Sequence, residues 1–159
     1  MATIAVGDIH GNLTQLDDLL VRALPLLAAE DHLVFLGDYV DRGPDPAGVV
    51  RRVRALTGET AARLVLLRGN HEDAWLRVVE GGWDAFVAPR PNGCLETLRS
   101  FTGKPCTPED VPTTEEEKLL YQGSFFPTKV LEWVNALPHW YEDEHAIYVH
   151  AGLMEHEGS

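Results

Sequence analysis

The chain is poor in cysteine, in basic residues and in long apolar runs. Only Cys94 and Cys106 occur among the 159 residues, so a disulfide framework is not needed to explain its stability. No apolar run approaches the ~20 residues that cross a bilayer. The N-terminus opens into a predicted strand, with no basic or apolar leader before it. We therefore expect a soluble, cytoplasmic protein that does not bind a membrane.

The scarcity of positive charge argues against nucleic acid as a partner. Lysine and arginine together number 13 against 25 acidic residues, which gives a formal net charge of −12. Such a chain offers no basic stripe to neutralise a phosphate backbone. A phosphorylated substrate would be repelled by the molecule as a whole, so local arginines must attract it.

The length and the apolar content favour one domain over residues 1–159. Hydrophobic residues make up 45% of the chain, which is enough for a proper core. Roughly the first eighty residues alternate short apolar runs with helical spacing, which predicts an α/β fold with a parallel sheet. From about 81 to 126 the pattern changes to helices and a proline-rich loop, which we expect beside the site. Residues 140–142 and 146–149 are typical of a hairpin.

Local signals predict helix ends and surface positions. Asn12 is expected to cap one helix and Asp45 to cap the next. The three glutamates at 115–117 are expected to form a solvated first turn of a later helix. His32 is expected to lie exposed in a turn.

Four polar clusters each follow a short apolar run that is typical of a buried strand. In chain order they are GDIHG at 7–11, GDYVDRG at 37–43, RGNHE at 68–72 and HAG at 150–152. In open α/β sheets the ends of the strands are where ligands bind. Carboxylate, imidazole and amide groups that converge there suit divalent metal ions.

The residue types in these clusters fit the hydrolysis of a phosphate ester. Paired metals activate water and neutralise phosphoryl oxygens when they sit ~3.5–4 Å apart. A bridging carboxylate is the usual way to hold two like charges that close together. Asp38 is the natural bridge between the other candidate ligands, which are Asp8, His10, Asn70 and His150.

Further residues in the clusters suit the substrate rather than the metal. Arg42 and Arg68 can present planar forks to phosphate oxygens. His71 can act as a general acid, and Asp41 can orient it and keep it protonated.

Taken singly, each of these signals has an ordinary structural explanation. An Asp after Gly is usually a turn residue, and Asp8 with His10 could be a satisfied loop pair. Four strand ends that all deliver ligand-type residues are not explained in that way. The combination therefore favours a functional site.

In this order, the motifs GDIHG, GDYVDRG, GNHE and HAG resemble the phosphoprotein phosphatase (Ser/Thr phosphatase-like) branch of the calcineurin-like metallophosphoesterases, in its small bacterial form. The resemblance covers residues 3–153. It implies a metallo-dependent phosphatase fold, which is a sandwich of two mixed sheets flanked by helices. It also implies a dinuclear centre of divalent metal ions, with Mn²⁺ first and Fe or Zn as alternatives.

The resemblance also implies a role for each matching residue. Asp8, His10 and Asp38 would hold one metal. The other metal would be held by Asp38, Asn70 and His150. Phosphate would be contacted by Arg42 and Arg68, and the leaving group would receive a proton from His71, paired with Asp41. A metal-bridging hydroxide would attack phosphorus directly.

The resemblance is incomplete after the HAG motif. The family normally has a further metal-ligating His and a further phosphate-binding Arg there, and only residues 153–159 follow in this chain. His156 could substitute only by accident. Either the chain is part of a longer protein, or it is a short form. A short form would have an incomplete second sheet and a weakened second metal site.

We expect a metal-dependent phosphate monoesterase of the protein Ser/Thr phosphatase type, because GDYVDRG carries both Asp41 and Arg42. A bis(5'-nucleosyl)-tetraphosphate hydrolase shares the metal motifs and is the alternative among enzymes. A catalytically impaired domain that binds metal or phosphate is the alternative outside enzymes. The expected partner is a phosphorylated substrate, either a phosphoprotein or a small phosphoester.

Overall fold

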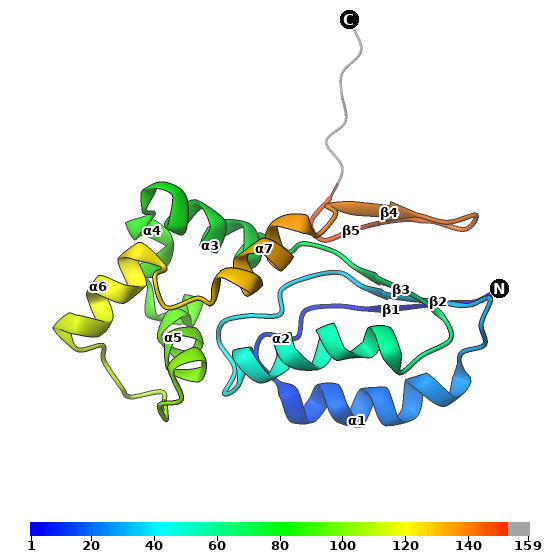
Figure 1. The fold of residues 1–159 in the computed structure, drawn as a ribbon, viewed down its shortest axis with the longest axis horizontal. Helices are drawn as coiled ribbons and strands as arrows, with labels where there is room; N and C mark the ends of the chain where they lie inside the picture. Colours follow the sequence, from blue (N-terminus) through cyan, green and yellow to red (C-terminus); the bar gives the residue numbers. More distant parts are fainter. Residues whose placement is uncertain (153–159) are drawn as a thin grey trace, which may run out of the picture.

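A computed structural model describes residues 1–152, and its centre is a parallel three-stranded sheet (Figure 1). The strands are β1 (Thr3–Val6), β2 (His32–Phe35) and β3 (Arg63–Leu66), in the order β1-β2-β3. Thr3 lies opposite His32, which in turn lies opposite Arg63. The parallel sheet predicted from the alternating pattern is therefore confirmed.

Helices α1 (Leu13–Ala23) and α2 (Pro46–Ala55) connect the strands and cover the same face of the sheet (Figure 1). Successive right-handed crossovers in one direction along a sheet place their helices on one side. Leu33 and Phe35 of β2 point into this layer and are fully buried in the main core. Val34 is buried on the opposite face. Because β2 is covered on both sides, Leu33, Val34 and Phe35 form an apolar run after His32.

A hairpin covers the second face of the sheet. It consists of β4 (Trp140–Glu142) and β5 (Ile147–Val149), which pair antiparallel. Tyr141 and Tyr148 pack against Val34 and its apolar neighbours in β3 and beyond. The predicted hairpin is thus confirmed, and it supplies the second layer of a sandwich flanked by helices. The first sheet differs from the mixed sheet implied by the resemblance, because every strand pair in it is parallel within residues 1–152.

A group of helices lies at one end of the sheet (Figure 1). It contains α3 (Asn70–Gly81), α4 (Asp84–Val87), α5 (Cys94–Thr102), α6 (Thr114–Gln122) and α7 (Thr128–Ala136). Short 3₁₀ turns follow α1 at Leu24–Leu26, α2 at Leu56–Gly58 and α4 at Arg90–Asn92. Trp75 of α3 organises their packing, because Phe86, Phe125 and Phe126 meet its ring edge-on at 5.1–5.6 Å between centroids. None of the helices within residues 1–152 is both long enough and apolar enough to span a membrane.

Asp45 caps α2 as predicted, because its side chain accepts from the Gly48 amide. The predictions for Asn12 and His32 are wrong. Asn12 precedes α1 but does not cap it with its side chain. Its amide donates instead to the carbonyls of Ile9 and His10, at 2.8 and 3.0 Å. His32 is buried in β2 rather than exposed in a turn.

The glutamate run at 115–117 is only partly solvated, so that prediction is wrong for its middle residue. Glu116 is 2% exposed and hydrogen-bonds to the Arg99 guanidinium of α5 at 3.2 Å. The hydrogen bond from Arg99 lowers the pKa of Glu116 to about 2. The same carboxylate completes a capping box with Thr113.

Candidate metal centre and active site

The polar clusters that follow β1, β2, β3 and β5 meet at one edge of the structure. Every predicted site residue lies in one of them: Asp8, His10, Asp38, Asp41, Arg42, Arg68, Asn70, His71 and His150. The carboxyl ends of parallel strands share one edge of the sheet, which explains why clusters far apart in the sequence converge. His156, by contrast, falls outside the described residues.

Left-handed backbone is concentrated in these loops. His10, Asp38, Asp41 and Arg42 have φ of 45°, 56°, 69° and 65°. Such a conformation costs about 1–3 kcal/mol at a non-glycine residue and persists only where the surroundings hold it. Here the amides of Ile9 and His10 both donate to the Asp38 carbonyl, at 3.1 and 2.9 Å, so the two loops hold each other in place.

Glycine at position 69 brings the next loop close to Asp38. A Cβ at Gly69 would lie 2.1 Å from Oδ1 of Asp38 and 2.3 Å from its backbone nitrogen. Any side chain there would push the Asp38 loop away from the start of α3.

Glu72 organises these loops, and it was not among the predicted site residues. It is 1% exposed and accepts from the amides of Asp38, Tyr39 and Val40 at 2.8, 2.8 and 3.2 Å, and from that of Gly69 at 3.0 Å. Burial, followed by the charge of Asp38, raises the pKa of Glu72 to about 7. Its place at the third position of α3, where capping-box glutamates occur, is the sequence signal that could have found it.

Asp38 lies between two imidazoles. Its Oδ2 is 3.4 Å from Nε2 of His10, and its Oδ1 is 3.5 Å from Nε2 of His150. The Asp8 carboxylate flanks the same pair, 3.8 Å from Nε2 of His10 and 3.9 Å from Nδ1 of His150. Asp38 is 2% exposed, so its negative charge is unshielded by water.

Hydrogen bonds fix which nitrogen of each imidazole is free. Nδ1 of His10 lies 2.8 Å from the Val40 carbonyl, and Nδ1 of His150 lies 3.1 Å from the Leu36 carbonyl. A carbonyl can only accept, so each Nδ1 carries a proton, and Nε2 is the ring nitrogen that each imidazole directs toward Asp38. Ring nitrogens oriented in this way are typical of metal ligands.

The donor set at this edge fits divalent cations. Nε2 of His150 is 2.7 Å from Oδ1 of Asn70, and both atoms lie beside the Asp38 carboxylate. Asp8, Asp38 and His150 place ligand atoms within 4.8 Å of one another. Carboxylate, amide and imidazole groups that converge in this way can be held together by a divalent ion among them.

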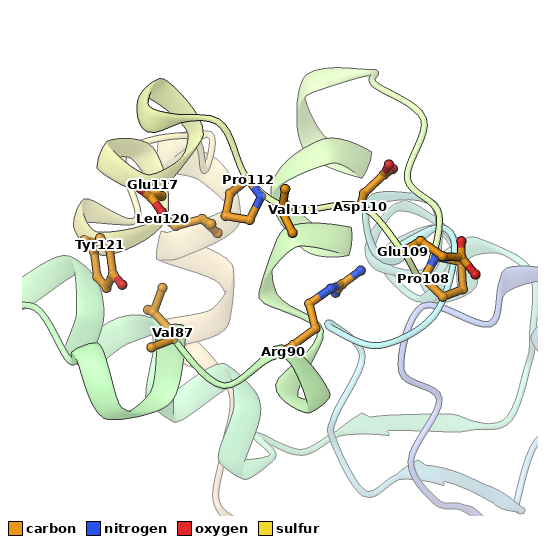
Figure 2. Close-up of a pocket in the computed structure, with 11 residues that line it drawn as sticks. Val87, Arg90, Pro108, Glu109, Asp110, Val111, Pro112, Glu117, Leu120 and Tyr121 are labelled. Atoms are coloured by element: carbon orange, nitrogen blue, oxygen red, sulfur yellow. The ribbon is translucent and has the colours of Figure 1, made fainter.

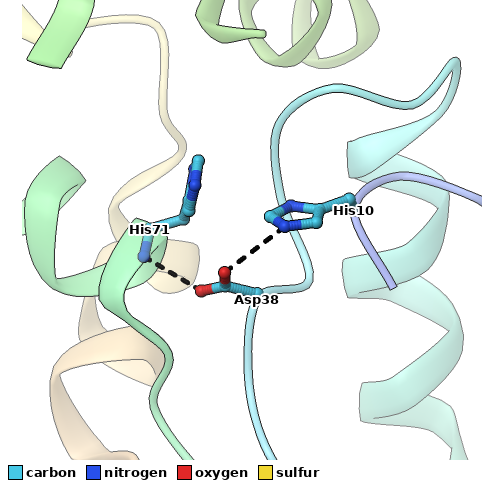
Figure 3. A group of neighbouring side chains, drawn as sticks. All are labelled: His10, Asp38 and His71. Atoms are coloured by element: carbon cyan, nitrogen blue, oxygen red, sulfur yellow. Dashed lines mark hydrogen bonds and ion pairs between the residues drawn. The ribbon is translucent and has the colours of Figure 1, made fainter. Parts of the chain in front are cut away.

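His10, Asp38 and His71 also have ligand atoms within 4.8 Å of one another (Figure 3). The bond from His71 to Asp38, however, comes from its backbone amide, at 3.0 Å, while its ring points away from that carboxylate (Figure 3). Nδ1 of His71 lies instead 2.7 Å from Oδ2 of Asp41. Nδ1 of His71 is therefore bonded to Asp41 and not to Asp38.

Asp41 and His71 form a buried pair with further support. Asp41 is completely buried and accepts from the indole of Trp75, at 2.9 Å, and from the hydroxyl of Thr97. Burial lowers the pKa of His71, but the hydrogen bond and charge of Asp41, with the charge of Asp38, outweigh burial and raise it above its usual value. The charge of Arg42 opposes this rise, but the net direction is the one that a proton donor requires. Trp75 and Thr97 were not predicted, because they come from α3 and α5 and carry no motif.

The two arginines differ in their surroundings. Arg42 extends across the site, with Nη1 2.8 Å from Nε2 of His10 and Nη2 3.2 Å from Nε2 of His71. Arg68 is bonded to Asp73 at 3.2 Å and to the Asn135 carbonyl. Nε of Arg68 is buried without a hydrogen-bond partner among residues 1–152. Arg68 also lines an open hollow of about 290 Å³ with Asn70, His139 and His150.

Comparison with known proteins gives a consistent result. A family model described as calcineurin-like phosphoesterase matches residues 1–153. A symmetrical bis(5'-nucleosyl)-tetraphosphatase of Dechloromonas aromatica is 32% identical over 154 residues, which are 97% of this chain and 45% of that relative. One from Janthinobacterium sp. is 49% identical over 72 residues, which are 45% of this chain and 24% of the relative.

Two further similarities bear on substrate class. A Caenorhabditis elegans protein, provisionally named a serine/threonine-protein phosphatase, is 39% identical over 79 residues, 48% of this chain and 20% of that protein. A solved structure, provisionally named a diadenosine tetraphosphatase, is 29% identical with a TM-score of 0.58, and covers 95% of this chain and 50% of its own. The chain spans about half the length of these proteins or less.

Proposed function

The chain belongs to the calcineurin-like phosphoesterase family. We propose that it catalyses the metal-dependent hydrolysis of a bis(5'-nucleosyl) tetraphosphate. The relatives that align with 97% of the chain bear that name. The Asp41 and Arg42 pair by itself favours a protein Ser/Thr phosphatase, but the similar protein of that name aligns with only 48% of the chain. The tetraphosphatase alternative is therefore the better supported of the two.

The observation that carries the proposal is the position of Asp38 between His10 and His150. We assign Asp8, His10 and Asp38 to one divalent ion, and Asp38, Asn70 and His150 to the other. Paired divalent ions supply Lewis-acid stabilisation of phosphoryl charge and an activated water. The metal identity is not assigned, and Mn²⁺ is the first ion to test.

The remaining side chains act on the substrate. Arg42 and Arg68 present guanidinium forks to phosphoryl oxygens, which the net charge of −12 would otherwise repel. Since Arg42 contacts Nε2 of His71, a phosphoryl group held by Arg42 lies beside that nitrogen. As a water oxygen bonds to phosphorus and the P–O bond to the leaving group breaks, His71 would give its proton to the leaving oxygen, and Asp41 orients the ring through Nδ1.

Substrate preference, measured with and without Mn²⁺, tests this function. The chain is offered diadenosine tetraphosphate, a phosphoserine peptide and an aryl phosphate, each in Mn²⁺ and in chelator. We expect Mn²⁺-dependent turnover that is fastest on the tetraphosphate. Faster turnover of the peptide would favour the protein phosphatase alternative. Bound metal without turnover of any substrate would leave only the binding-domain alternative. A cytoplasmic location remains a prediction from the sequence.

A further inference from the structure

Helix α5 lies outside the four motifs, yet it contacts the 41–45 loop near both of its ends. Gly93 directly precedes α5, and a Cβ there would lie 2.0 Å from the backbone nitrogen of Arg42. In the last turn of α5, the Ser100 hydroxyl donates to Oδ1 of Asp45 at 2.7 Å. The helix therefore packs directly against a loop that carries proposed site residues.

Thr97, between these two contacts, bonds to Asp41 in two ways. Its hydroxyl oxygen accepts from the Asp41 amide at 2.8 Å, and its hydroxyl proton is donated to Oδ1 of the same residue. Both residues are completely buried. Asp41 has a left-handed backbone, with φ of 69°, which persists only where the surroundings hold it. A hydroxyl suits this position, because one oxygen atom both donates and accepts.

The bonds to the Asp41 carboxylate determine which oxygen faces His71. Oδ1 accepts from the Thr97 hydroxyl and, at 2.9 Å, from the Trp75 indole. Oδ2 lies 2.7 Å from Nδ1 of His71. Because Thr97 holds both the amide and Oδ1 of Asp41, the plane of the carboxylate is fixed relative to α5.

We propose that Thr97 is a positioning residue for the proton donor, because it holds Asp41 in the orientation that directs the His71 ring. Nε2 of that ring lies 3.2 Å from Nη2 of Arg42, the residue proposed to hold the phosphoryl group. The inference rests on the proposed function for the proton transfer, but Thr97 itself comes from a helix without a motif.

Direct binding of substrate is the alternative role for this group of helices. A hollow of about 600 Å³ lies between α4, α6 and the loop that precedes α6 (Figure 2). Its charged lining residues are Arg90, Glu109, Asp110 and Glu117. Arg90 is already paired with Glu96 at 2.6 Å. Three carboxylates with one paired arginine do not attract a phosphate, so a positioning role fits the helices better.

Loss of the Thr97 hydroxyl would leave two buried groups of Asp41 short of a partner. Within residues 1–152 the Asp41 amide has no other hydrogen bond, and Oδ1 would keep only the Trp75 indole. A buried donor without an acceptor is costly, so the left-handed loop is expected to shift. The His71 ring would follow the carboxylate away from its present orientation.

Thr97→Ala removes both bonds and adds no bulk. The full chain is assayed in Mn²⁺ on an alkyl phosphate and on an aryl phosphate with an acidic leaving group. We expect kcat on the alkyl phosphate to fall about tenfold, less than in His71→Asn, because the ring is still present but misoriented. The aryl phosphate should lose less, and the metal content should not change. Thr97→Ser keeps the hydroxyl and should restore the rate.

Thr102→Ala is the matched control. Thr102 ends the same helix, is exposed, and donates to the Leu98 carbonyl at 2.9 Å rather than to the loop. Its loss should leave kcat unchanged on both substrates. If Thr97→Ala does not fold, Thr97→Val, which keeps the volume of the side chain, is measured in its place. Equal losses on the two substrates, or no rescue by Thr97→Ser, would overturn the proposal.

Proton NMR separates this inference from the proposed function. The Nδ1 proton of His71 lies in a hydrogen bond to a carboxylate, so it gives a signal far downfield, which His71→Asn identifies by removing it. Thr97→Ala should shift this signal and speed its exchange with water, and Thr102→Ala should do neither. An unchanged signal in Thr97→Ala would overturn the proposal even in an active chain. A changed signal in a chain that hydrolyses no phosphate would support the positioning of His71 by Thr97 and contradict the proposed function.

Discussion

Asp38 connects the two sides of the candidate metal centre, because each of its carboxylate oxygens faces a different imidazole. Asp38→Asn keeps the shape of the side chain but removes its charge, so we expect loss of metal at both positions. Asn70→Ala removes a ligand of one position only and should leave about half of the metal. Elemental analysis after gel filtration in Mn²⁺ measures this. If the two variants kept equal amounts of metal, Asp38 would not be a bridge.

His71 should affect the rate and leave the metal content unchanged. Its ring is bonded to Asp41 rather than to Asp38, so His71→Asn removes a proton donor and no ligand. The expected loss of turnover is about 10²–10⁴-fold on an alkyl phosphate, whose leaving group needs a proton. An aryl phosphate with an acidic leaving group should lose less. Equal losses on both substrates, or loss of bound metal, would contradict the role of proton donor.

At the scale of residues, the sequence predicts those whose position follows from a motif at a strand end. Asp38 and His150 come together because parallel strands end at one edge. Glu72, Trp75 and Thr97 support the same site from within helices, and their contacts depend on how those helices pack. Thr97 reaches Asp41 across 56 positions of sequence, a distance that no local pattern spans.

At the scale of elements, a buried ion pair between Arg99 and Glu116 joins α5 to α6. The pKa of Glu116 is about 2 in the folded chain, against an ordinary value of 4.5. A lowered pKa stabilises the fold above about pH 4.5, and this contribution is lost as the pH falls toward 2. This contribution of Glu116 to the free energy of unfolding is at most roughly 3 kcal/mol.

Glu116→Gln should therefore lower the free energy of unfolding at neutral pH. It should also flatten the dependence of that free energy on pH between about 4.5 and 2. Urea unfolding across this range measures both effects, and Glu115→Gln is the matched control, because Glu115 is exposed on the same turn. An equal acid sensitivity of Glu116→Gln and the unchanged chain would show that the pair does not stabilise the fold.

The elements themselves could largely be predicted, because apolar periodicity and caps are local. The hairpin, the parallel sheet and the Asp45 cap follow from such signals. The errors occur where a distant segment covers a polar residue. His32 is buried because the Tyr141 hydroxyl, 3.2 Å from its Nδ1, approaches from the hairpin. Glu116 is buried because Arg99 approaches from α5.

At the scale of the whole molecule, the net negative charge repels anionic ligands, whereas the arginines of the site attract them. The net charge of −12 disfavours anionic ligands in general, while Arg42 and Arg68 lie in the site. Long-range repulsion with local attraction restricts binding to ligands that reach these arginines. A polyphosphate that reaches Arg42 and Arg68 meets this condition.

The central claim is that paired metals lie on either side of Asp38. An anomalous difference map from crystals grown in saturating Mn²⁺ tests it most directly. We predict two peaks about 3.5–4 Å apart, with the Asp38 carboxylate between them. One peak should lie by Asp8 and His10, and the other by Asn70 and His150. A single peak held by His10, Asp38 and the His71 ring, or no peak at this edge of the sheet, would contradict the account.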